Sequence, residues 1–214
     1  MARDHGSKIE SADVLRMFPT FVWKAELKPD VYQGINENIL RKLDQLRDSM
    51  PEIERGQAWQ SDQALHELDE FHELVSCIND TSHSLLKFLK IGCDAFRITA
   101  LWANVVMPRA GHKMHSHPNN FLSGVYYVQA DDGADTINFH DPRSQTGIIR
   151  PPVTELTAEN TDQVVVKVKN GTLLVFPAWL PHSVDANTSQ KARISISFNI
   201  MVHSYSEDLS KPLW

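Results

Sequence analysis

Cysteine is scarce in this sequence, and long hydrophobic runs are missing. The 214 residues include two cysteines, Cys77 and Cys93, which are too few for a disulfide framework. No apolar run approaches the ~20 residues that a membrane span needs. The opening string MARDHGSKIESADVLRMFP carries acidic residues where a signal peptide needs a continuous apolar stretch. These absences predict a reduced, cytoplasmic protein that has no membrane partner.

Positive charge is also in short supply. The chain has 21 lysines and arginines against 27 aspartates and glutamates, and its formal net charge is −6. Proteins that bind nucleic acid need a basic surface, so nucleic acid is not expected as a partner. Hydrophobic residues make up 42% of the chain and charged residues 22%, which is the composition of a folded globular protein. We see no repeat and no linker, and we expect a single domain spanning residues 1–214.

The N-terminal part, residues 1–97, has the apolar spacing of helices. Apolar side chains recur at helical intervals through residues 35–50. A second helix is expected from Ser61, whose side chain would cap it, to about Lys90. A short strand is expected within residues 17–27. The N-terminal part is therefore expected to be largely helical.

Residues 98–214 have a different texture, in which short β-branched and aromatic runs alternate with turn residues. About eight such runs occur, among them FRITALWANVVM, FLSGVYYVQ and ARISISFNIM. The dipeptide Asn170-Gly171 separates QVVVKVK from TLLVF and predicts a β-hairpin between them. This spacing favours a mainly β sandwich or jelly roll, with the N-terminal helices packed on it.

The chain has ten histidines, and three of them, His112, His115 and His117, lie within the string GHKMHSHPNN. On a strand, side chains two positions apart share a face, so His115 and His117 can point into one site. His112 has the opposite parity, unless a bulge at Gly111 reorients it.

A distant histidine completes a candidate set. His182 follows the segment FPAWLP, whose two prolines stiffen the turn that delivers it to a new strand. Two histidines on one face plus a distant third make a facial three-ligand set with open positions. Such a set suits Fe(II), and also Zn, Cu and Ni. Taken singly, His182 fits an ordinary surface loop better than a ligand position.

The strand ARISISFNI separates polar from apolar side chains by parity. Its polar face can lie in solvent, or it can line a pocket while the N-terminal helices cover the apolar face. In the second case Arg193 is a buried fork for a carboxylate. In RITALWANVVM, Trp102 and Asn104 share a face, and a buried Asn104 needs hydrogen-bond partners. Trp102 and Trp179 belong either to the core or to the pocket wall, and the core is favoured.

Three strings carry a resemblance to a known family: HSHPNNFLSGVYYV, FPAWLPHSV and ARISISFN. They resemble the Fe(II)- and 2-oxoglutarate-dependent oxygenases, and are most similar to a bacterial family related to the prolyl-hydroxylase branch. The resemblance covers residues 98–201. It implies a double-stranded β-helix (jelly roll), with Fe(II), 2-oxoglutarate and O2 used to hydroxylate a substrate C–H bond.

The same resemblance implies roles for individual residues. The metal ligands are His115, His117 and His182. The residues that contact 2-oxoglutarate are Arg193, Ser195, Tyr127 and Asn104. Arg193 grips the distal carboxylate of the cosubstrate, and the neighbouring Tyr126 faces the other side of its strand. No protein acid or base beyond the metal ligands is required.

One ligand departs from the wider superfamily, whose second ligand is a carboxylate where this chain has His117. Three neutral imidazoles leave an Fe(II) site at +2 and strengthen its attraction for an anionic chelate. Asp131, Asp132 and Asp141 are weaker candidates for a missing carboxylate. One alternative function is a three-His metal dioxygenase of cupin type that does not use 2-oxoglutarate. Another is a non-enzymatic β-sandwich binding module, with incidental histidines or a structural zinc.

The substrate is not identified by the sequence, and a small molecule or a peptide both fit. Arg143 and Arg150 either line the mouth of the pocket or belong to a solvated turn. The oligomeric state is also open, with a homodimer as the commonest form of association.

Overall fold

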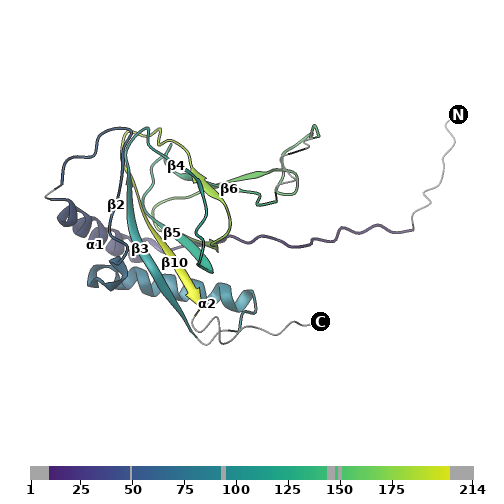
Figure 1. Ribbon diagram of the computed structural model, residues 1–214, viewed down its shortest axis with the longest axis horizontal. Coiled ribbons are helices and arrows are strands. Elements are labelled where there is room, and N and C mark those ends of the chain that lie inside the picture. Colours follow the sequence, from purple (N-terminus) through teal and green to yellow (C-terminus); the bar gives the residue numbers. More distant parts are fainter. Residues whose placement is uncertain (1–9, 49, 93–94, 144–147, 149–150, 203–214) are drawn as a thin grey trace.

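The computed structural model describes residues 10–48, 50–92, 95–143, 148 and 151–202, so Cys93 and Arg150 lie outside the described residues. Two antiparallel sheets face each other (Figure 1). The larger sheet has the order β1 (Trp23–Glu26), β8 (Thr172–Pro177), β5 (Leu122–Gln129), β10 (Arg193–Val202), β3 (Phe96–Val106), β2 (Ala58–Gln60). The smaller sheet has the order β4 (His112–His115), β9 (His182–Val184), β6 (Thr136–His140), β7 (Gln163–Lys167).

The chain passes back and forth between these sheets. From β3 to β10, consecutive strands lie in opposite sheets at every step except β6 to β7, which pair with each other. This winding is that of a jelly roll, so the expected mainly β fold class is confirmed. A pocket can form between the sheets, where inward-facing side chains of both meet.

The expected hairpin at Asn170-Gly171 is wrong. A turn is present there, because Thr172 N donates to Lys169 O at 3.0 Å and Gly171 has a φ of 82°. However, β7 pairs with β6, while β8 pairs with β5 and β1. The turn therefore carries the chain from one sheet to the other. Asn-Gly specifies a local change of direction, whereas burial decides which strands pair: TLLVF is buried between two neighbours and QVVVK is largely exposed.

Two helices cover the outer face of the larger sheet, α1 (Pro29–Arg47) and α2 (His72–Phe88), as Figure 1 shows. Short 3-10 turns η1 (Leu65–Glu67) and η2 (Asp69–Phe71) precede α2. Pro29 stands in the first turn of α1, where its missing N–H costs nothing. No described helix is long and apolar enough to cross a membrane.

The expected start of the second helix at Ser61 is wrong, because α2 begins at His72. The Ser61 hydroxyl instead accepts a hydrogen bond from Ala103 N at 2.9 Å and ties the chain to β3. Cys77 on α2 is half-buried against the main core, and burial raises the pKa of its thiol.

Strand β10 separates two environments. Its apolar side chains Ile196, Phe198 and Ile200 are fully buried in the cluster that the helices complete. Its polar side chains Arg193 and Ser195 are also buried, but they line the space between the sheets. The strand therefore lines a polar pocket and does not present a polar face to solvent.

Candidate metal and cosubstrate site

Three imidazoles converge at the mouth of the space between the sheets. His115 ends β4, His182 begins β9, and these two residues pair across the ladder. His117 lies just beyond β4, where its backbone N–H donates to Ala178 O at 2.9 Å. One ring nitrogen from each histidine lies within 4.8 Å of the others. This separation is compatible with a metal ion at the centre of the three, at ordinary metal–nitrogen distances.

The backbone orients two of these rings. Nδ1 of His115 lies 2.8 Å from Lys113 O, and Nδ1 of His182 lies 3.0 Å from Leu180 O. Because a carbonyl only accepts, each Nδ1 carries the proton and each Nε2 keeps its lone pair for a metal. Burial lowers the pKa of His117 and of His182 to about 4. Both rings are therefore neutral at neutral pH, as metal binding requires.

A fourth histidine shares the pocket because of a bulge. The register between β4 and β9 shifts by one residue between His112 and His115. This extra residue turns His112 toward the pocket, against the simple parity argument, although His112 is not part of the three-histidine cluster. A Cβ added to Gly111 would lie 2.6 Å from Val184 O, so glycine allows β9 to approach the bulged segment closely.

Arg193 lies deeper in the same pocket and is 3% exposed. Its Nη1 donates to Thr136 O at 3.1 Å, and its Nη2 donates to Tyr127 Oη at 3.3 Å. Its Nε is buried and has no hydrogen-bond partner among the described residues. No described carboxylate forms an ion pair with it either. The pocket thus holds a buried cation and an unsatisfied donor, a combination that is costly unless an anion binds there.

The remaining predicted contact residues lie beside this cation or line the same pocket. Tyr127 is fully buried, its ring lies 5.0 Å from the Arg193 guanidinium carbon, and burial raises the pKa of its hydroxyl. Ser195 and Asn104 face each other across the β10–β3 ladder, and both line the pocket. Tyr126, as expected, points the other way, and its hydroxyl donates to Asn36 Oδ1 at 2.7 Å beneath α1.

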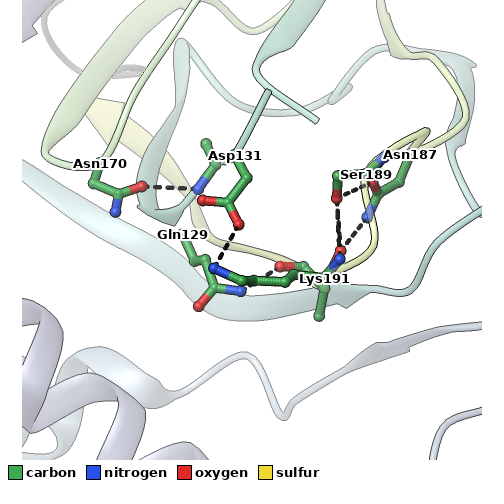
Figure 2. Close-up of polar contacts among 8 residues, drawn as sticks. Gln129, Asp131, Asn170, Asn187, Ser189 and Lys191 are labelled. Atoms are coloured by element: carbon green, nitrogen blue, oxygen red, sulfur yellow. Dashed lines mark hydrogen bonds and ion pairs between the residues drawn. The ribbon is translucent and has the colours of Figure 1, made fainter. Parts of the chain in front are cut away.

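Polar contacts hold the loop that precedes β10 in place, as Figure 2 shows. Asn187 is 2% exposed; its Nδ2 donates to Lys191 O at 2.8 Å, and its Oδ1 accepts from Ser189 Oγ at 2.7 Å. Gln129 Nε2 donates to Ala192 O at 2.6 Å. Both residues before Arg193 are therefore held through their carbonyls, which limits how far its side chain can shift.

The two tryptophans lie in different environments. Trp102 forms a wall of the pocket, with its ring centroid 5.9 Å from that of His117. Trp179 is 54% exposed, so the expectation of a core position is wrong for it. Its neighbours Ala178 and Leu180 take the buried positions of that turn.

The weaker carboxylate candidates do not join the cluster. Asp131 pairs with Lys191 at 3.2 Å and Asp141 with Arg143 at 2.7 Å, while Asp132 is exposed. The exposed Arg143 fits the solvated turn better than the mouth of the pocket. In the described part of the chain, the three histidines are the sole group with metal-ligand spacing.

Sequence reasoning missed Gln60. This residue ends β2, lines the pocket, and donates from Nε2 to Asn104 Oδ1 at 2.8 Å. No motif marks it, because its place in the pocket depends on the pairing of β2 with β3.

A family model matches a little under half of the chain. Residues 100–199 match the model of a family described as "Putative 2OG-Fe(II) oxygenase". No curated protein sequence matches the chain.

Solved structures share the fold at low identity. The non-heme alpha ketoglutarate dependent carbocyclase SnoK from nogalamycin biosynthesis is 16% identical, with a TM-score of 0.62 over 86% of this chain and 80% of that chain. HygX from Streptomyces hygroscopicus, with nickel and 2-oxoglutarate bound, is 11% identical, with a TM-score of 0.59 over 86% and 84% of the two chains. A Pseudomonas putida prolyl-4-hydroxylase is 14% identical, with a TM-score of 0.55 over 86% and 94%. These likenesses agree with the jelly-roll topology.

Proposed function

We propose that this chain, whose residues 100–199 match the model of a family of 2OG-Fe(II) oxygenases, is an Fe(II)- and 2-oxoglutarate-dependent oxygenase that hydroxylates a substrate C–H bond. We propose His115, His117 and His182 as the metal ligands. Bound Fe(II) supplies the redox chemistry, in which O2 and 2-oxoglutarate give succinate and CO2 while a substrate C–H becomes C–OH.

The three imidazoles suit this role by their charge and orientation. They are neutral ligands on one side of the proposed metal, and no described carboxylate joins them. The metal would keep its full +2 charge, which strengthens its attraction for an anionic chelating cosubstrate. The backbone contacts of His115 and His182 hold those rings ready before a metal arrives.

The observation that carries the proposal is Arg193, a buried cation with an unsatisfied Nε in the pocket of the three histidines. A 2-oxoglutarate carboxylate supplies both the negative charge and the acceptor that this guanidinium lacks. We propose that Arg193 holds the carboxylate far from the metal, with Tyr127 and Ser195 beside it. Asn104 is proposed to contact the cosubstrate nearer the metal.

The alternatives predict a different pocket. A three-histidine dioxygenase that does not use 2-oxoglutarate has no need of a buried cation such as Arg193. A structural zinc site is normally closed by a fourth ligand, and His112, which lines the same pocket, is not part of the cluster.

The substrate, the location and the assembly are also proposals. A small molecule or a peptide would reach the metal through the mouth where His115 is exposed. The scarcity of cysteine supports a cytoplasmic location, which cell fractionation tests. A homodimer is proposed only as the commonest assembly, and light scattering tests it.

The decisive experiment is an anaerobic titration. Fe(II) and then 2-oxoglutarate are added, and the visible charge-transfer band of the chelate is recorded. We expect a band that is lost in His182→Ala and kept in His83→Ala, which alters an exposed histidine on α2. Stoichiometric iron without a band would favour the dioxygenase that does not use 2-oxoglutarate. Absence of stoichiometric iron would favour the binding module.

A further inference from the structure

A chain of three polar side chains runs along the wall of the pocket. Gln60 Nε2 donates to Asn104 Oδ1 at 2.8 Å, and Asn104 Nδ2 donates to Ser197 Oγ at 2.9 Å. All three side chains line the pocket. Gln60 comes from β2, outside the residues that match the family, and it is exposed at the rim.

The direction of these hydrogen bonds decides whether the pocket offers donors or acceptors to a ligand. With Asn104 Oδ1 turned toward Gln60, the amide places its Nδ2–H protons on the other side. One proton bonds to Ser197, and the second has no acceptor among the described residues. Ser197 Oγ accepts from Asn104, and its own hydroxyl proton has no acceptor among the described residues either. Two donors are therefore available to a ligand.

Strand register places these donors between Arg193 and the histidines. Arg193 pairs with Val106, and two residues further along Ser195 pairs with Asn104. Another two residues along, Ser197 pairs with Trp102, whose ring contacts His117. A strand rises ~3.3 Å per residue, so the level of Ser195 and Asn104 lies ~7 Å along β10 from Arg193. Ser197 Oγ lies 2.9 Å from Asn104 Nδ2, so a five-carbon dicarboxylate held by Arg193 at one end would meet both donors near its metal end.

We propose that Gln60 is a positioning residue that fixes the Asn104 amide with its N–H protons toward the pocket. Asn104 and Ser197 then donate to the 2-oxoglutarate carboxylate beside the metal. This inference rests on the proposed function. Gln60 does not touch the cosubstrate; it sets the orientation of the group that does. Without the N–H donor of Gln60, the Asn104 amide can rotate. An acceptor in place of that donor would turn the amide round, with Nδ2 toward residue 60 and Oδ1 away from it.

The test compares three variants in anaerobic 2-oxoglutarate titrations of the iron-loaded protein. Gln60→Glu puts an acceptor where Nε2 stood, so Asn104 turns its Nδ2 toward the introduced carboxylate and Ser197 donates to Asn104. Gln60→Leu removes the contact without adding charge. Gln63→Glu is the matched control, because it adds the same charge at an exposed side chain with no hydrogen bond in the described part of the chain.

We expect Gln60→Glu to raise the Kd for 2-oxoglutarate about tenfold or more, and Gln60→Leu about threefold, as loss of one or two hydrogen bonds implies. The Kd for Fe(II) should stay within about twofold, since no described hydrogen bond joins Gln60 to the three histidines. Gln63→Glu should leave both dissociation constants unchanged. The two Gln60 variants should also shift the absorption band of the chelate, which a purely structural role would leave in place.

A double-mutant cycle provides an independent measurement that also holds if one variant loses stability. Ser197→Ala should raise the Kd less in the Gln60→Leu background than alone, because the hydrogen-bond chain is already broken. Additive effects, or a Gln60→Glu protein with the wild-type Kd, would overturn the inference and leave the proposed function intact. A wild-type protein that binds iron but does not respond to 2-oxoglutarate would refute both.

Discussion

Replacing Arg193 with methionine should weaken 2-oxoglutarate binding without weakening the fold. The side chain is 3% exposed, it has a buried Nε without a partner, and no described carboxylate neutralises it. Its hydrogen bonds go to Thr136 O at 3.1 Å and Tyr127 Oη at 3.3 Å, both neutral acceptors. The cation is therefore poorly compensated until an anion binds.

The expected magnitudes follow from these contacts. A hydrogen bond to a charged group contributes about 1.5–3 kcal/mol. A guanidinium that donates two such bonds to the carboxylate therefore contributes at least ~3 kcal/mol, so Arg193→Met should raise the Kd for 2-oxoglutarate roughly 100-fold. Replacing an uncompensated buried charge by an apolar side chain of similar length is neutral or stabilising by ~1–2 kcal/mol. The ligand-free protein should thus unfold at the same temperature or a few degrees higher.

The assay combines thermal unfolding of the ligand-free protein with anaerobic titration of Fe(II) and 2-oxoglutarate. The Kd for Fe(II) should stay within about twofold, because Arg193 is not among the metal-binding group. Arg97→Met makes the same chemical change at an exposed position of β3 and should alter neither quantity. An unchanged Kd for 2-oxoglutarate would refute the assignment of Arg193. A loss of more than ~1 kcal/mol of stability would refute the argument that the cation is uncompensated.

Three further predictions concern stability and ligand binding. Tyr126→Phe should cost about 1 kcal/mol of stability and leave 2-oxoglutarate binding unchanged. Tyr127→Phe should raise the Kd for 2-oxoglutarate a few-fold with less effect on stability. Titrations and thermal melts of both variants test this, and the opposite pattern would refute it. Gly111→Ala should lower both the melting temperature and the affinity for Fe(II), because its Cβ would lie 2.6 Å from Val184 O and push β9 away; an unaltered Fe(II) titration would contradict this. Burial lowers the pKa of His182 from 6.5 to about 4 in the metal-free folded protein. Between these two pH values, His182 is therefore protonated in the unfolded chain and neutral in the folded one. Stability should therefore fall between pH 6.5 and 4, by up to ~3 kcal/mol for this residue. Denaturant melts of His182→Gln should show a smaller loss of stability over this pH range than those of the wild-type protein. Identical pH profiles for the two proteins would refute the prediction.

The sequence predicted most of the candidate site because the relevant signals are local. Alternation along β10 put Arg193 and Ser195 on one face, and alternation along β5 separated Tyr127 from Tyr126. Both assignments hold, since a strand sends successive side chains to opposite faces whatever its partners are. The order of the motifs supplied the remaining histidine, His182, from a distant turn.

Other expectations failed where local signals compete with burial. Asn170-Gly171 makes a turn, but the two runs that it joins belong to different sheets. Ser61 has the chemistry of a helix cap, yet its hydroxyl accepts from the backbone of β3 and α2 starts at His72. In each case the local preference was satisfied in another way, while long-range packing fixed the element.

The sequence by itself determined which side chains of each strand share a face and that two helices precede the strands. It also singled out three histidines and an arginine as candidate site residues. The tertiary structure alone decided that β10 lines a pocket, because the helices had to cover its apolar face first. It also decided that a bulge turns His112 inward and that Gln60 reaches Asn104 from β2. These facts depend on register between distant strands. Register is set by the packing of the whole molecule, and no short stretch of sequence encodes it.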